Sequence, residues 1–346
     1  MRSRVYFVGS RFPHHARHSG YEGFARYVGR MLRMPFRSRW RGGNLGWALD
    51  RRIAAWTRPH YASGILLIEA AAALHMLFTR RAVYHLIYGD VDLWMLPRLR
   101  RLLAPRHRVV VSFHEPKPPE WVGLEKAAPD IDAVVLVSGS QRAALAASFP
   151  AERTFVIPHG VDTAFFKPGS GESRERVVLT VGSHLRDFET LRVAIDHVLV
   201  RDPSVRFVAV GSRERGRDYV GLEHERVTYF DKIDDEELRR LYQTATVMVL
   251  PLRAATANNA LLEAMACGLP VVATDLEGIR EYLGDEAGLF CKPRDAAALG
   301  EAMSRILENP ELGARMGEAG RARALGLDYQ RVAERMQTFY DGLLRS

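Results

Sequence analysis

One acidic residue, Glu263, stands inside a predicted helix of the segment Ala245 to Ala273, ATVMVLPLRAATANNALLEAMACGLPVVA. The apolar pattern of this segment predicts a strand, a small polar loop, a helix over Leu261 to Cys267 and a second strand. Asn258 or Asn259 could cap that helix. A helix N-terminus suits a phosphate, and a carboxylate nearby can accept hydrogen bonds from sugar hydroxyls. The pattern fits a nucleotide-sugar site, whereas the competing interpretation makes Glu263 an exposed residue that the helix dipole favours.

Two glycine-bearing turns could approach a phosphate. Gly182 to Arg186 follows a predicted strand and precedes a predicted helix, so its backbone amides and guanidinium could face a diphosphate. Gly20 to Gly23 is a similar turn after the first predicted strand. Neither turn has the G-x-G-x-x-G or P-loop pattern, so neither indicates a dinucleotide or a nucleoside triphosphate.

Two histidines, His114 and His159, each follow an apolar run directly. A histidine at a strand end can donate to a developing charge, and it can equally bond to a backbone carbonyl. The residues alone favour the structural role. H-E-x-x-H, paired C-x-x-C and G-x-S-x-G segments are missing from the sequence, which argues against metalloproteases, zinc ribbons and α/β-hydrolases.

The 346 residues exceed what one core usually organises, so two domains are expected. Cys267 and Cys291 have neither metal-ligand nor redox spacing, and a reducing cytoplasm is the simplest setting for them. The beginning of the sequence does not resemble a secretory signal. Ala62 to Phe78 is the longest apolar stretch, but it is too short and too polar for a membrane span and is predicted to be a buried helix.

Positive charge is concentrated in the first half of the chain. Residues 1–165 hold 24 Lys and Arg against 12 Asp and Glu, whereas residues 166–346 hold 25 against 29. Gly23 to Leu49 has no acidic residue, and its arginines include Arg33, Arg37, Arg39 and Arg41, interleaved with apolar side chains. Such a segment fits an anionic membrane surface or a lipid-linked acceptor. An ordinary helix with a solvated arginine face is the alternative, and nucleic acid is not expected.

Strand-like and helical segments alternate along both halves, as in doubly wound parallel sheets. Strands are predicted at 5–8, 83–87, 109–113, 133–137, 155–158, 177–181, 207–210, 227–230, 247–250 and 270–273. Helices are predicted at 20–32, 65–78, 189–199, 235–244, 261–267, 296–308 and 328–344. The polar segment Lys167 to Arg176 has no apolar period and is predicted to link two domains. Ligands of such α/β sheets bind at the carboxyl ends of the strands.

Together these segments resemble the family 4 glycosyltransferases, the glycosyl transferases of group 1. Residues 155–168, 177–194 and 262–273 carry the resemblance. It implies the GT-B fold: Rossmann-like domains at 1–166 and 177–326 that face each other across a cleft, a linker at 167–176, and a helix at 327–346 that packs back on the first domain. It also implies sugar transfer from a nucleoside-diphosphate sugar with retention of anomeric configuration.

The resemblance implies a role for each candidate residue. Glu263 would hold the donor ribose, Arg186 would face the diphosphate and His114 would lie beside the transferred sugar, and these three are assigned to catalysis. The remaining residues of the implied donor site are Gly20, Gly182, Ser183, Asn258 and Asn259. A metal ion or other cofactor is not expected, because Arg186 and the helix N-terminus can offset the diphosphate charge.

Three positions depart from the family pattern. His159 stands where asparagine is usual, Ala255 replaces the first of two glutamates, and Ser183 replaces an arginine. Two functions therefore stay open. One is a hexosyltransferase for cell-surface polysaccharide or glycoconjugate, acting on a glycan or lipid-linked acceptor at the inner membrane face. The other is a nucleotide-sugar-binding GT-B protein that has lost catalysis and serves as a partner or regulator.

Overall fold

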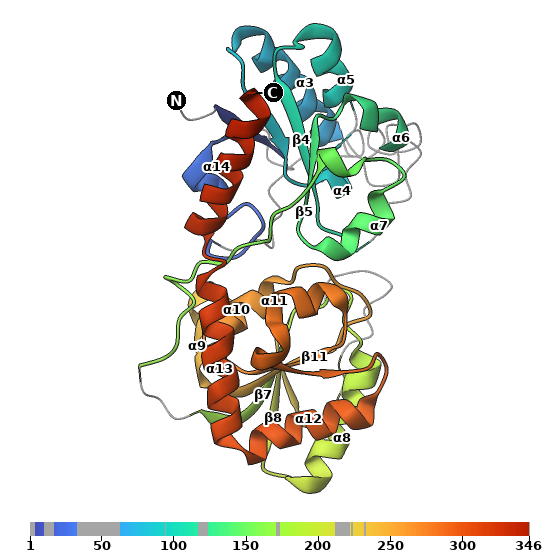
Figure 1. Ribbon diagram of the computed structural model, residues 1–346. Coiled ribbons are helices and arrows are strands. Elements are labelled where there is room, and N and C mark those ends of the chain that lie inside the picture. The colour runs from blue at the N-terminus through green and yellow to red at the C-terminus, as the bar shows by residue number, and fades with distance from the viewer. Residues whose placement is uncertain are drawn as a thin grey trace, which may run out of the picture. The chain divides into compact units, whose positions relative to one another are not determined.

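The computed structural model describes residues 4–9, 17–32, 63–93, 95–116, 124–170, 174–211, 222, 224–231 and 233–345. The chain divides into two compact units (Figure 1). Unit 1 comprises Met1–His15, Phe24–His159 and Gln330–Ser346, and unit 2 comprises Ala16–Gly23 and Gly160–Tyr329. The predicted membrane-facing residues Arg33, Arg37, Arg39 and Arg41 lie outside the described residues.

Unit 1 is built on a six-stranded parallel sheet of order β2-β1-β3-β4-β5-β6. Its strands are β1 (Val5–Val8), β2 (Arg30–Leu32), β3 (Val83–Leu86), β4 (Arg108–Phe113), β5 (Ala133–Leu136) and β6 (Thr154–Val156). Its helices are α1 (Ala25–Val28), α3 (Ser63–Phe78), α4 (Gly89–Asp92), α5 (Leu96–Leu103), α6 (Leu124–Ala127), α7 (Arg142–Leu145) and, from Gln330 onward, α14 (Tyr329–Arg345). Three short 3-10 helices are η2 (Ala128–Asp130), η3 (Gly139–Gln141) and η4 (Ala151–Arg153).

Unit 2 has a second six-stranded parallel sheet, of order β12-β11-β10-β7-β8-β9, which is the classical doubly wound arrangement. Its strands are β7 (Glu175–Val181), β8 (Arg206–Val210), β9 (Val227–Phe230), β10 (Ala245–Leu250), β11 (Val271–Thr274) and β12 (Gly288–Cys291). Its helices are α8 (Phe188–Arg201), α9 (Asp235–Thr244), α10 (Asn259–Ala266), α11 (Glu277–Ala287), α12 (Ala296–Glu308) and α13 (Pro310–Leu325). The structure thus has the α/β class and the parallel sheets predicted from the sequence.

Two sequence predictions for unit 1 are wrong in part. The helix predicted at 20–32 is one turn long, and Arg30–Leu32 instead form strand β2, which pairs with β1. The stretch that ends at Phe78 is helical, but it is not a buried helix, because Leu67, Leu74, Leu77 and Phe78 are exposed. None of the helices in the described ranges is long and apolar enough to cross a membrane.

The structural division differs from the predicted domain limits. Ala16–Gly23 belong to unit 2, although the sequence placed them in the first domain. The main segment of unit 2 begins at Gly160 rather than after residue 166, and Phe166 there is fully buried, with its carbonyl accepting a hydrogen bond from Arg321 of α13. Strand β7 begins at Glu175, inside the predicted linker. At the C-terminus, Tyr340 of α14 contacts His85 of β3, both in unit 1.

Candidate functional site

The central loops of unit 2 meet where the strand order reverses. Strands β7 and β10 are neighbours at this reversal, and open α/β sheets bind ligands at the carboxyl ends of the strands at such a point. There the backbone N–H of Arg253 donates to the Leu185 carbonyl at 2.9 Å, and that of Asp187 donates to the Pro251 carbonyl at 3.0 Å. The loop predicted to face a phosphate is therefore joined to the loop that leads into α10.

Arg186 is folded back against its own loop. Its Nη2 and Nε donate to the Val181 carbonyl at 2.5 and 3.2 Å, and its Nη1 donates to the His184 carbonyl at 3.1 Å. Burial lowers the pKa of Arg186 to about 10, so the guanidinium stays charged at neutral pH. The arginine predicted to face a diphosphate thus supports the loop and brings a buried positive charge to the switch point.

Gly182 and Ser183 lie half-buried in this loop. Gly182 has a φ of +85°, and a Cβ there would lie 2.9 Å from Nη2 of Arg186, so glycine suits both the backbone and the space. Its N–H already donates to the Val210 carbonyl at 2.7 Å. The Gly182 N–H is therefore used in the sheet, and the contact of this loop with a phosphate stays a prediction.

Helix α10 begins as the sequence predicts. The Asn258 side chain accepts a hydrogen bond from the Leu261 N–H at 3.1 Å, so Asn258 is the cap and Asn259 is the first helical residue. Glu263 lies one turn further along and is buried. This position contradicts the alternative of an exposed glutamate at the helix start.

Two hydroxyl groups donate to the Glu263 carboxyl. Ser19 Oγ donates to Oε1 at 2.5 Å, and Tyr242 Oη of α9 donates to Oε2 at 2.9 Å. Burial raises the pKa of Glu263 to about 7, against the lowering effect of both hydrogen bonds. The carboxyl is therefore held in one orientation and titrates near neutral pH.

The segment around Ser19 is anchored to unit 2 by several contacts. The His18 ring stacks on Phe165 at 3.8 Å between centroids, and its Nδ1 lies 2.8 Å from Asp162 Oδ2. The Tyr329 hydroxyl donates to the carbonyl of Gly20 at 2.8 Å. The predicted turn at Gly20 thus lies next to the serine that contacts Glu263.

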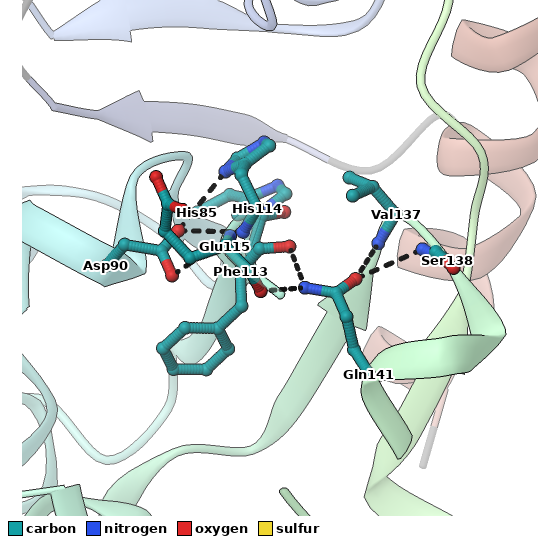
Figure 2. Close-up of polar contacts among 9 residues, drawn as sticks. His85, Asp90, Phe113, His114, Glu115, Val137, Ser138 and Gln141 are labelled. Carbon is teal, nitrogen blue, oxygen red and sulfur yellow. Dashed lines mark hydrogen bonds and ion pairs between the residues drawn. The ribbon is translucent and has the colours of Figure 1, made fainter. Parts of the chain in front are cut away.

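In unit 1, His114 follows β4 as the sequence predicts and lies beside Asp90 (Figure 2). The His114 backbone N–H donates to Asp90 Oδ2 at 2.7 Å, and its Nδ1 lies 3.6 Å from the same oxygen. Both side chains are 9% exposed. A carboxylate next to an imidazole can orient the ring, which suits a hydrogen-bond donor at a strand end.

A glutamine holds the backbone on both sides of His114. Gln141 Nε2 donates to the carbonyls of Phe113 and Glu115 at 3.0 Å, and its Oε1 accepts from the N–H groups of Val137 and Ser138 (Figure 2). These four contacts join the loop after β4 to the loop after β5. The position of His114 is therefore set by backbone contacts as well as by Asp90.

Unit 1 also buries His85, His107 and His159. His85 Nδ1 bonds to the Tyr340 hydroxyl at 2.5 Å, and its Nε2 bonds to Ser112 Oγ at 2.7 Å. Burial lowers the pKa of His85 to about 3, so this ring is neutral and structural. His159 is 5% exposed, in keeping with the structural role that the sequence favoured.

The structure brings most of the predicted donor-site residues of unit 2 together. Gly182, Ser183 and Arg186 share one loop, whereas Asn258 caps α10 and Asn259 and Glu263 lie in its first turns. Sequence reasoning missed Ser19 and Tyr242, which lie 244 and 21 residues from Glu263 in the chain and carry no motif that could reveal them. Among the described residues, no group of three or more His, Cys, Asp or Glu could hold a metal ion.

Comparisons with known proteins point to one family. Residues 175–309, which contain the Glu263 and Arg186 sites, match the family model "Glycosyl transferases group 1". The MMP alpha-(1->4)-mannosyltransferase of Mycolicibacterium hassiacum is 27% identical over 66% of this chain and 59% of its own length. The phosphatidyl-myo-inositol mannosyltransferase of Mycolicibacterium smegmatis is 31% identical over 54% of this chain and 51% of its own. The chain thus spans between one half and three fifths of these two relatives.

A solved structure matches almost the whole chain. Anabaena HepE, crystallised in complex with UDP-glucose, superposes with a TM-score of 0.69 over 98% of this chain and 100% of its own, at 16% identity. This likeness confirms the predicted GT-B fold with its two parallel six-stranded sheets. Residues 175–309 are thus similar to the group 1 glycosyl transferases, and nearly the whole chain has the GT-B fold.

Proposed function

We propose that the protein transfers a sugar from a nucleoside-diphosphate sugar to a hydroxyl acceptor, with retention of anomeric configuration. Unit 2 binds the donor in this proposal, and unit 1 supplies His114 and the acceptor site. The observation that carries it is the pairing of two loops at the switch point of unit 2, with Glu263 buried and oriented behind them.

The Glu263 carboxyl suits a ribose. A carboxylate offers about four acceptor positions, so the hydrogen bonds from Ser19 and Tyr242 leave capacity for two sugar hydroxyls. The start of α10 and the guanidinium of Arg186 supply positive potential for the diphosphate, as the departing group requires. In this proposal transfer needs no metal ion or other cofactor.

His114 is proposed to act on the transferred sugar. Its ring is backed by Asp90 and lies at the carboxyl end of β4, where parallel sheets bind ligands. A hydrogen bond from this ring to a sugar hydroxyl would hold the donor while positive charge develops on the sugar. The protein contributes mainly positioning and electrostatic stabilisation to such a reaction.

The acceptor is proposed to be a glycan, lipid-linked or other hydroxyl acceptor in cell-surface polysaccharide or glycoconjugate synthesis. The name of the phosphatidyl-myo-inositol mannosyltransferase supports a lipid-linked acceptor. We place the reaction in the cytoplasm at the inner membrane face. The buried free thiols of Cys267 and Cys291 support a reducing compartment.

A calorimetric screen of the purified protein against UDP, GDP, TDP and ADP tests the donor site. One diphosphate is expected to bind more tightly than its nucleoside, and Glu263→Ala should abolish that binding. Glu318→Ala, an exposed glutamate of α13, is the matched control and should bind normally. Failure of all four diphosphates to bind would contradict the donor site.

Hydrolysis of the matching nucleotide sugar then separates the two functions that the sequence left open. Slow release of free sugar without an acceptor indicates a transferase. Tight binding without any hydrolysis or transfer would support a regulator that has lost catalysis, consistent with Ala255 and Ser183 in place of charged family residues.

A further inference from the structure

One helix pair of unit 1 exposes large apolar side chains. On α3, Leu67, Leu74 and Phe78 are spaced by seven and four residues, so they lie on one face of the helix, and Phe78 is 85% exposed. The last two residues of α5, Leu102 and Leu103, are also exposed, Leu102 to 64%. Soluble surfaces rarely gather so many large apolar groups, and such gatherings mark interaction sites.

The C-terminal ends of α3 and α5 lie side by side. Both helices lead into parallel neighbours, β3 and β4, so both end at the edge of the sheet where the strands begin. Arg106, just after α5, donates from Nη2 to the carbonyls of Met76, Leu77 and Thr79 at 2.7 to 3.0 Å. The exposed residues of the two helices therefore belong to one surface, at the opposite edge of the sheet from His114.

The charge around this surface is positive. Arg80 and Arg81 lie two and three residues after the end of α3, and Arg98 lies on α5; all three are exposed. The nearby carboxylates are turned inward, because Glu69 accepts hydrogen bonds from the N–H groups of Met95 and Leu96 and is fully buried.

Two further carboxylates near α5 are paired with arginines. Asp130 pairs with Arg101 at 3.0 Å, and Asp132 pairs with Arg100 at 2.8 Å. Apolar side chains flanked by exposed arginines complement a surface that is apolar inside and anionic outside.

We propose that the C-terminal ends of α3 and α5 dock on a bilayer that contains anionic lipid. Leu74, Phe78 and Leu102 enter the apolar region, while Arg80 and Arg81 contact the headgroups. Each apolar side chain contributes by leaving water, and each arginine contributes by attraction to the negative surface. The docking surface shares no residue with the donor site, so its test does not depend on the transfer reaction.

Sedimentation of the full chain with vesicles tests whether the exposed apolar side chains contribute to membrane binding. Wild type is expected to bind vesicles of phosphatidylcholine with phosphatidylglycerol and to bind pure phosphatidylcholine vesicles much more weakly. Leu74→Gln with Phe78→Gln should lower binding at least tenfold. The matched control is Val193→Gln with Val200→Gln on α8, where Val200 is 86% exposed, and this control should bind like wild type.

Separate variants test whether the exposed arginines contribute to membrane binding. Arg80→Gln with Arg81→Gln should lower binding about fivefold for each arginine at low salt, and the difference should shrink as salt rises. Arg192→Gln with Arg305→Gln, two exposed arginines of unit 2, should have no effect. Because all these side chains are exposed, the variants are expected to unfold at the wild-type temperature.

Three results would overturn the proposal. The first is that the protein with Leu74→Gln and Phe78→Gln binds mixed vesicles as tightly as wild type does. The second is that wild type binds duplex DNA more tightly than mixed vesicles at equal charge concentration. The third is a concentration-dependent dimer, detected by analytical ultracentrifugation, that the Leu74 and Phe78 substitutions abolish, since the surface would then bind a second copy of the chain.

Discussion

Replacing Glu263 with glutamine should reverse the stability order of wild type and variant between pH 5 and pH 8. Burial raises the pKa of Glu263 from 4.5 to about 7, so the folded protein holds this proton more tightly than the unfolded chain does. The stabilisation is fully present below pH 4.5 and is lost as pH rises towards 7. At about 1.4 kcal/mol for each pH unit of that interval, the free energy of unfolding falls by about 3 kcal/mol.

The glutamine variant lacks this pH dependence because its side chain does not ionise. Its amide nitrogen would face either Ser19 or Tyr242, whose hydroxyl now donates to the carboxyl and would have to turn and accept. That rearrangement costs about 1 kcal/mol, the usual worth of one hydrogen bond. The variant should be about 1 kcal/mol less stable than wild type at pH 5 and about 2 kcal/mol more stable at pH 8.

Urea unfolding followed by circular dichroism at both pH values measures these differences. Glu318→Gln is the control, because Glu318 is exposed, and its stability should follow wild type at each pH. If the free energies of unfolding of wild type and of Glu263→Gln changed by the same amount between pH 5 and pH 8, the reasoning would be refuted. Glu263 would then titrate alike in the folded and unfolded chains.

Three further variants address the other contacts. Arg186→Ala removes the buried positive charge and the contacts that hold its loop, so it should weaken nucleoside diphosphate binding by about 1.5 to 3 kcal/mol, the range for an interaction with a charged group. Calorimetry that finds equal wild-type affinity for nucleoside and diphosphate would exclude this role. His114→Ala should lower kcat more than it raises the donor KM, and steady-state kinetics with an unchanged kcat would make His114 a binding residue instead. Tyr340→Phe leaves the buried His85 ring without one partner and should cost about 1 to 3 kcal/mol, seen as faster hydrogen exchange in α14, whereas unchanged exchange would show that packing alone holds the helix.

Most elements could be predicted because they carry strong local signals. Strand β1 has exactly the predicted bounds, and α10 has the predicted asparagine cap, since β-branched runs and caps act within a few residues. The short strand β2 was predicted as helix, because three residues carry too little periodicity and its pairing with β1 depends on a residue more than twenty positions away.

The exposed face of α3 could not be predicted for a different reason. Hydropathy shows that Leu74 and Phe78 prefer to leave water, but it does not show whether another part of the chain covers them. In the structure Met76 and Ala72 of the same helix are buried in the unit 1 core, while Leu74 and Phe78 are not. The hydropathy of the sequence therefore does not distinguish the apolar residues on the buried face of α3 from those on its exposed face.

The candidate site, too, could be predicted from the sequence only in part. The loops after β7 and β10 could be placed from the sequence, because loops that follow parallel strands lie at the same edge of the sheet, where such sheets bind ligands. The environment of Glu263 could not, since Ser19 reaches it from a segment 244 residues away and Tyr242 reaches it from another helix. These two donors and the burial around them determine when the carboxyl is charged. A linear motif thus locates the carboxyl, whereas the tertiary fold decides its protonation and hence the pH at which it accepts hydroxyl hydrogen bonds as an anion.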